Sequence, residues 1–126
     1  MAATAEIIVQ ATIMNLGDQK QFSEKFTDTN TPDKVYHGYT VIGATAVLLS
    51  TKCGIPTAQV LGVAIRAAVS TVYYNVVSTT ISTKGCYLPA GQANYISMKP
   101  GNTGKLTVKG TASLAAVDFI VYGKVT

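Results

Sequence analysis

The fold is decided by residues 83–124, which read TKGCYLPAGQANYISMKPGNTGKLTVKGTASLAAVDFIVYGK. Short runs of β-branched and aromatic residues alternate there with turn residues such as Pro89, Gly91, Pro100 and Gly101, a pattern typical of short strands joined by tight turns. We expect these strands at residues 87–88, 95–98, 106–109 and 117–122. The last of them, VDFIVY, has the composition of a strand that closes a sheet, so the rest of the chain must supply its partners.

Upstream of this stretch the sequence predicts further strands at residues 6–14, 21–27, 44–49 and 71–77, and either a strand or an ordered loop around Gly38 at residues 35–41. In the first of them both sets of alternating side chains are fairly apolar, which favours a strand covered on both sides. In the second, Phe22, Glu24 and Phe26 share one face. Residues 57–70 favour a loop and a strand, with a short helix near 57–64 as the alternative, because Gly62 weakens a helix that the alanines would favour.

Seven to nine strands at a spacing of roughly 8–12 residues predict an all-β fold. We expect an antiparallel β-sandwich or a jelly-roll-like barrel, in a single domain that spans residues 1–126 and includes at most one short helix. The Thr-, Asn-, Asp- and Pro-rich residues 28–34 are expected to form an exposed loop excursion. They are not expected to be a domain boundary, since the residues before them are too few to fold alone.

The charge of the chain is sparse and unevenly placed. Hydrophobic residues make up 48% of the sequence and charged residues only 13%, about half the share usual in soluble proteins. Either other chains cover part of the surface, or the surface is neutral and rich in Thr, Ser and Gly. Residues 1–33 hold two lysines against five carboxylates, a net −3, while residues 34–126 hold seven lysines and Arg66 against Asp118 alone, a net +7. The two parts can attract each other within a chain or between copies, or the basic part can face an acidic surface.

Membrane and secretion signals are not found in the sequence. No apolar run approaches the ~20 residues of a membrane helix, and the first 20 residues lack the basic start of a signal peptide. We expect Cys53 and Cys86 to be free, partly buried thiols, although the sequence leaves open whether they pair.

No catalytic constellation is found either, so we expect a protein that is not an enzyme and needs no cofactor or metal. His37 is the only histidine and stands in Val-Tyr-His-Gly-Tyr without a nucleophile motif, which favours a surface or turn position. One histidine and two separated cysteines do not make a zinc site, and the loop carboxylates Asp28 and Asp33 are expected to be solvated. GNTGK at residues 101–105 lacks the spacing of a phosphate loop and favours a hairpin turn.

Aromatic side chains single out one candidate protein interface, formed by Phe22, Phe26, Tyr36 and Tyr39. Aromatic residues are enriched at protein interfaces. The alternative for each of these rings is a position in the hydrophobic core. Nucleic acid is not the expected partner. A lysine cluster surrounds one hairpin, but lysines on a hairpin also protect sheet edges from pairing with other chains. Proteins that recognise base edges in a groove rely on arginine, and this chain has only one. The cluster consists of Lys84, Lys99, Lys105 and Lys109.

Residues 72–91, VYYNVVSTTISTKGCYLPAG, contain an aromatic strand, a Thr/Ser loop and the step Gly85-x-x-Leu88-x-Ala90-Gly91, and an aromatic strand follows near residue 120. This half of the chain resembles small β-sandwich structural proteins of tailed bacteriophage virions. It departs from them at residues 75–78, where NVVS stands in place of a charged hairpin. The resemblance implies a decoration or cement protein of the capsid, or another head or tail component, that works as a homo-oligomer.

Our leading hypothesis is therefore a virion structural protein, assembled in the host cytoplasm, that binds the outside of a capsid and bridges coat subunits. Its partners would be the major capsid protein or other virion proteins, without a membrane. The alternative is a carbohydrate- or receptor-binding β-sandwich of a phage tail that uses Tyr36, Tyr39 or Tyr87 as stacking platforms. A non-specific nucleic-acid-binding protein is the third hypothesis.

Overall fold

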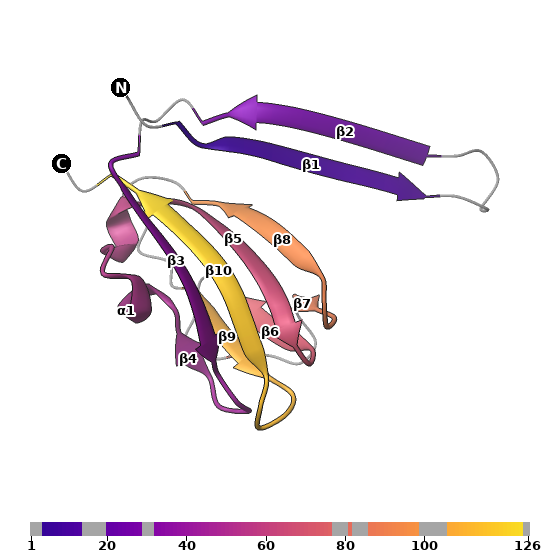
Figure 1. Cartoon of the computed structure of the whole chain (residues 1–126), viewed down its shortest axis with the longest axis vertical. Coiled ribbons are helices and arrows are strands. Elements are labelled where there is room, and N and C mark those ends of the chain that lie inside the picture. The colour runs from indigo at the N-terminus through magenta and orange to yellow at the C-terminus, as the bar shows by residue number, and fades with distance from the viewer. Residues whose placement is uncertain are drawn as a thin grey trace. The chain divides into compact units, whose positions relative to one another are not determined.

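The computed structural model describes residues 4–13, 20–28, 32–76, 81, 86–98 and 106–124. These residues form ten strands, all paired antiparallel, and confirm the expected all-β class (Figure 1). In chain order the strands are β1 (Glu6–Ile13), β2 (Lys20–Thr27), β3 (Lys34–Val41), β4 (Val47–Leu48), β5 (Val60–Val69), β6 (Val72–Asn75), β7 (Tyr87–Leu88), β8 (Ala93–Ser97), β9 (Thr107–Gly110) and β10 (Ala116–Gly123).

The chain divides into two compact units, Met1–Pro32 and Asp33–Thr126. The expected loop at residues 28–34 spans this division. Residues 29–31 of the loop lie outside the described ranges, and Lys34 already begins β3. That residues 1–126 form one folding domain stays a prediction, and the two units are described separately below.

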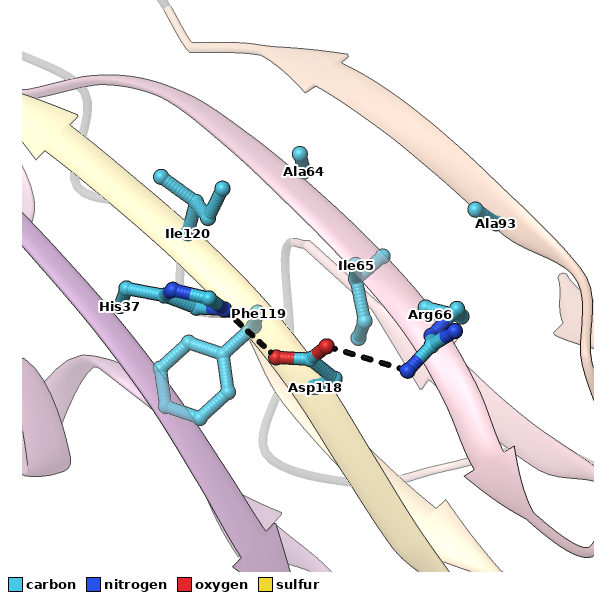
Figure 2. Close-up of a pocket in the computed structure, with 8 residues that line it drawn as sticks. All are labelled: His37, Ala64, Ile65, Arg66, Ala93, Asp118, Phe119 and Ile120. Carbon is cyan, nitrogen blue, oxygen red and sulfur yellow. Dashed lines mark hydrogen bonds and ion pairs between the residues drawn. The ribbon is translucent and has the colours of Figure 1, made fainter.

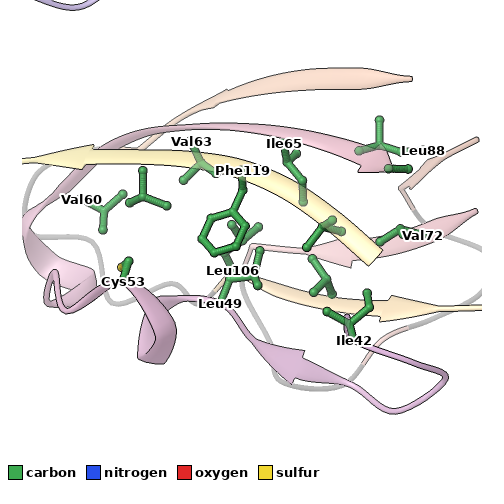
Figure 3. Close-up of a cluster of buried hydrophobic side chains, with 14 of the residues drawn as sticks. Ile42, Leu49, Cys53, Val60, Val63, Ile65, Val72, Leu88, Leu106 and Phe119 are labelled. Atoms are coloured by element: carbon green, nitrogen blue, oxygen red, sulfur yellow. The ribbon is translucent and has the colours of Figure 1, made fainter. Parts of the chain in front are cut away.

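The second unit is a sandwich of two four-stranded sheets, with strand orders β3-β10-β5-β8 and β4-β9-β6-β7. Side chains that alternate along β10 explain why the sandwich forms. Val117, Phe119 and Val121 are buried between the sheets, while Asp118 and Ile120 point to the other face. Figure 3 shows Phe119 at the centre of the cluster of apolar side chains that fills the space between the two sheets. The closing strand predicted at residues 117–122 is thus confirmed, and it lies inside its sheet between β3 and β5.

The ambiguous segment at residues 57–70 is a strand. A single 3-10 turn at Thr57–Gln59 leads into β5, which pairs with β10 on one side and β8 on the other. Most residues of β5 are buried, so the sequence shows no clean alternation there and is also compatible with a short helix.

A short α-helix, α1 (Ser50–Cys53), begins just after the strand expected at residues 44–49, of which only Val47–Leu48 pairs. The helix ends at Gly54, whose φ of 69° gives the left-handed conformation common at helix C-termini.

The first unit is a hairpin, in which β1 and β2 pair over eight residues each. Both strands were predicted, while the turn expected at residues 15–18 lies outside the described ranges. The expectation that other elements cover β1 on both faces is not met within the described part of this unit, because β2 is its only neighbour there and pairs with its edge.

Candidate interaction surfaces

The hairpin is amphipathic. Residues directly opposite each other in an antiparallel pair share a face, and the register sets Ile7 against Phe26, Val9 against Glu24 and Ala11 against Phe22. Phe22, Glu24 and Phe26 therefore lie together, as the sequence predicted. We call this set the arm face; its described members are Ile7, Val9, Ala11, Phe22, Glu24 and Phe26.

The opposite face of the hairpin is mostly polar. Glu6, Gln10, Ser23 and Lys25 lie there, and Lys25 Nζ is 2.7 Å from Glu6 Oε1. Both members of this ion pair are more than half exposed, so the pair adds at most about 1 kcal/mol to stability. Among the described residues of this face, Ile8 is the one large apolar side chain, and it is 65% exposed.

The arm face leaves large apolar rings in water. Phe22 is 52% exposed and Phe26 is 40% exposed, although both stand in a regular strand. A two-stranded hairpin on its own is marginally stable at best, and it gains stability when one face packs on another layer. The arm face thus has the character of a surface that packs against a partner.

The second surface is the outer side of the sheet β3-β10-β5-β8. On β3, Tyr36 turns inward and packs against the core, with its ring centroid 5.7 Å from that of Phe119, whereas Tyr39 lies on the outer side and is 58% exposed. Of the four aromatic residues proposed as an interface, Phe22, Phe26 and Tyr39 are therefore exposed, and Tyr36 belongs to the packing of the sandwich.

Exposed apolar residues surround a small group of charges on this outer side. We call the whole set the sheet face; it consists of Val35, His37, Tyr39 and Val41 of β3, Asp118 and Ile120 of β10, and Arg66 of β5. Figure 2 shows the three charged or titratable side chains on three neighbouring strands, with Asp118 between the other two.

Asp118 is the centre of this trio. His37 Nε2 lies 2.8 Å from Asp118 Oδ1, and Arg66 Nη2 donates to Asp118 Oδ2 at 3.2 Å. The carboxylate is mostly covered, whereas His37 and Arg66 are each more than half exposed. Arg66 keeps donors for a further acceptor, since a guanidinium carries five N–H groups.

The trio borders an open hollow of about 350 Å³. The described residues that line it carry no hydroxyl or thiol group. The remaining lining consists of Ala64, Ile65, Ala93, Phe119 and Ile120. This arrangement offers a shallow apolar surface on which the Arg66 guanidinium can bind an anion.

Two tyrosines pack closely at one end of the outer side of this sheet. The hydroxyls of Tyr95 and Tyr122 are 2.5 Å apart and share a hydrogen bond over Gly62 of β5. A Cβ at Gly62 would lie 2.5 Å from Tyr95 Oη and 2.6 Å from Tyr122 Oη. Only glycine leaves room for both rings in this arrangement.

The sequence alone does not reveal the trio. Arg66 is the only arginine and Asp118 the only carboxylate after Asp33, and each interrupts an apolar strand, which is a signal for the exposed side of a sheet. That they meet depends on the registers of β10 with β3 and with β5, which the sequence does not give. The surface position predicted for His37 is confirmed, on a strand and not in a turn.

The other candidate residues are placed apart from these two surfaces. Tyr87 is exposed in the second sheet, with its ring centroid 6.1 Å from that of Tyr73. Cys53 and Cys86 do not form a disulfide, as expected; Cys53 is buried, whereas Cys86 is exposed and not partly buried as predicted. Lys84, Lys99 and Lys105, together with the GNTGK segment, lie outside the described residues.

Among the residues that the structure describes, no three His, Cys, Asp or Glu side chains gather as metal ligands. Over the same ranges, no helix has the length and apolar character that crossing a membrane requires.

Comparisons of this chain with protein-family models, with curated proteins and with solved structures give no match.

Proposed function

We propose that this chain is a non-enzymatic structural protein of a virus particle, of the decoration or cement type. It would bind the outside of a capsid shell, bridge neighbouring coat subunits and be assembled in the host cytoplasm. The observation that carries the proposal is the arm face, which presents Phe22 and Phe26 to solvent on a hairpin.

The strength of one such contact can be gauged from the exposed rings. An aromatic side chain buries about 200 Å² in full, so the exposed parts of Phe22 and Phe26 offer about 100 and 80 Å². At about 25 cal/mol per Å² this is about 4–5 kcal/mol of favourable transfer free energy. The entropic costs of association offset much of it, so one contact is weak.

Repetition makes weak contacts sufficient on a shell. A protein that binds two neighbouring coat subunits, or that forms an oligomer, attaches through several contacts. Once the first contact has formed, the others form at a high effective concentration, so the overall affinity for the shell is much higher than that of one contact. The resemblance of residues 72–91 to phage virion proteins and the β-sandwich architecture also support this role.

The experiment is a binding measurement on particles purified from the culture that produces the chain. An antibody against the chain should label the outside of the particles in electron micrographs. After the chain has been stripped from the shells, added recombinant chain should co-sediment with them in a density gradient and saturate at a fixed ratio to the coat protein. A chain that is missing from the particles and remains at the top of the gradient would refute the proposal.

Matched variants test the arm face in the same gradient. The double variant Phe22→Ser with Phe26→Ser should lose binding, whereas Ile8→Ser, which removes a still more exposed apolar side chain from the opposite face, should bind like the parent chain. Circular dichroism of each variant confirms that the sandwich remains folded. Equal binding by all three chains would exclude the arm face as the attachment surface.

A carbohydrate- or receptor-binding module of a phage tail is the second candidate, favoured by one observation. Tyr39 is exposed directly across from Asp118 in the register of β3 and β10, so a stacking ring stands beside a charged trio and a hollow. On a glycan array this function predicts reproducible binding that Tyr39→Ala abolishes. Tyr36 does not serve this function in the structure, because its ring packs inward.

A further inference from the structure

We propose that the arm face of one copy of this chain packs on the sheet face of a second copy, and that two copies exchange their hairpins reciprocally. The inference rests on the proposed function in one respect only: it gives the form of the oligomer that would bind the shell. Its tests need no particle.

Each copy carries both halves of this contact. The arm face exposes Phe22 and Phe26, and the sheet face exposes Val35, Tyr39 and Val41. Monomeric proteins rarely leave contiguous apolar surfaces of this kind in water. A second copy brings a matching surface for each of them at once.

The two surfaces match in length. The strands of the arm face, β1 and β2, have eight residues each, and so do β3 and β10 in the sheet face. An eight-residue strand is about 27 Å long, and sheets stack face to face at about 10 Å with side chains filling the space between them. The hairpin is thus long enough to cover the two strands that carry most of the sheet face.

The area favours a reciprocal exchange over a single contact. A strip two strands wide and about 27 Å long covers about 270 Å², so one hairpin on one sheet buries about 540 Å² in total. Specific interfaces start at about 1,200 Å². Two reciprocal contacts bury about 1,100 Å² in one interface, which comes close to that limit, whereas one contact falls well short of it.

The charges also favour this pairing. Residues 1–32 hold two lysines against four carboxylates, and residues 33–126 hold eight basic residues against two carboxylates, so the units carry net charges of −2 and +6. Within the arm face, Glu24 is the one carboxylate and lies opposite Val9. Within the sheet face, Arg66 has donors beyond the one that binds Asp118. An ion pair between Glu24 and Arg66 of the two copies would fix the register of the exchange.

The first test is the mass of the purified full chain. Sedimentation equilibrium should show a dimer at micromolar concentration, and Phe22→Ser should raise its dissociation constant at least about thirtyfold, whereas Ile8→Ser should change it less than threefold. Glu24→Gln should weaken the dimer about tenfold, and should have little further effect in an Arg66→Gln background. A chain that stays monomeric up to 100-fold higher concentration would overturn the inference.

The second test identifies the surfaces and separates exchange between copies from folding back within one copy. In a Cys86→Ser background, a tagged Ala11→Cys chain and an untagged Ala93→Cys chain are mixed and treated with a thiol crosslinker about 10 Å long. Ala11 lies on the arm face, and Ala93 lies beside Arg66. Crosslinking should exceed that of the control pair, Ser23→Cys with Ala93→Cys, at least tenfold, because Ser23 lies on the opposite face of the hairpin.

The outcomes distinguish this inference from the proposed function. Crosslinks that form only within a chain carrying both Ala11→Cys and Ala93→Cys, and never between chains, overturn the exchange and show that the hairpin covers its own sheet. A monomer that still binds shells through its arm face overturns the exchange and leaves the proposed function standing. A crosslinked dimer that does not bind capsid shells refutes the proposed function and supports the exchange.

Discussion

Replacing Gly62 by alanine tests the close packing at one end of the outer side of the sheet β3-β10-β5-β8. In a strand, glycine is ordinarily less favourable than alanine by about 0.5–1 kcal/mol, so a generic expectation is that Gly62→Ala stabilises the protein. The structure predicts the opposite sign. A Cβ would approach Tyr122 Oη to 2.6 Å and Tyr122 Cε1 to 2.7 Å, far inside ordinary contact distance.

The magnitude follows from what must move. The obstructing atoms are the ends of two tyrosine side chains, so the rings must shift and the hydrogen bond between their hydroxyls is lost. The lost bond costs about 0.5–1.5 kcal/mol, and forced repacking costs about 1–3 kcal/mol. Replacing a strand glycine by alanine recovers about 0.5–1 kcal/mol of this cost. We therefore expect the free energy of unfolding to fall by about 2 kcal/mol in total. For a domain of this size, that lowers Tm by about 8–16 °C.

Chemical denaturation at one fixed protein concentration measures this loss, because an oligomer makes stability depend on concentration. The matched partner is Tyr122→Leu, which removes the ring and its hydroxyl. If the clash is the cause, Gly62→Ala should destabilise the Tyr122→Leu protein at least 1 kcal/mol less than it destabilises the parent. A Gly62→Ala chain as stable as the parent, or additive effects in the double variant, would refute the reasoning.

Asp118→Ala removes the acceptor that binds Arg66 and His37, whose side chains are both mostly exposed, so denaturant titration should show a loss below about 1 kcal/mol; a loss of 3 kcal/mol would give the trio a structural role. Burial raises the pKa of the Tyr74 hydroxyl, and a hydrogen bond from Asn94 lowers it, so Asn94→Ala should move tyrosine ionisation in an ultraviolet titration to higher pH. Because the folded-state pKa lies above the ordinary 10.0, stability should fall as pH rises past 10.0, and less steeply in Tyr74→Phe; an identical fall in both chains would contradict this. A thiol reagent should modify exposed Cys86 in the native protein and buried Cys53 only after unfolding, and rapid modification of both would argue against the packing around α1.

The sandwich was predictable because its strongest signals are local. Alternation of Val117, Phe119 and Val121 with Asp118 and Ile120 identifies a strand and its buried side from the sequence alone. The limits of prediction appear where burial removes that alternation, as in β5, which is buried on most of its positions.

The candidate surfaces were predictable only in part. Period-two alternation placed Phe22 and Phe26 on one face, and the same rule separates Tyr36 from Tyr39, because an odd number of steps along a strand changes the face. The trio of His37, Asp118 and Arg66 needs two inter-strand registers between segments far apart in the chain. No local property of the sequence carries that information.

The positions of β9 and β10 have a consequence for how the protein is made. Each of these late strands lies between two earlier ones, β9 between β4 and β6, and β10 between β3 and β5. While the chain emerges from the ribosome, each four-stranded sheet therefore lacks a central strand until β9 and β10 have been made. Before then, β3 and β5 have no β10 between them to pair with. Pairings between segments so distant in sequence form slowly and leave strand edges open to other chains in the meantime. Synthesis halted before β9 would leave both four-stranded sheets without a central strand, so we expect the sandwich to form only after β9 and β10 have been made.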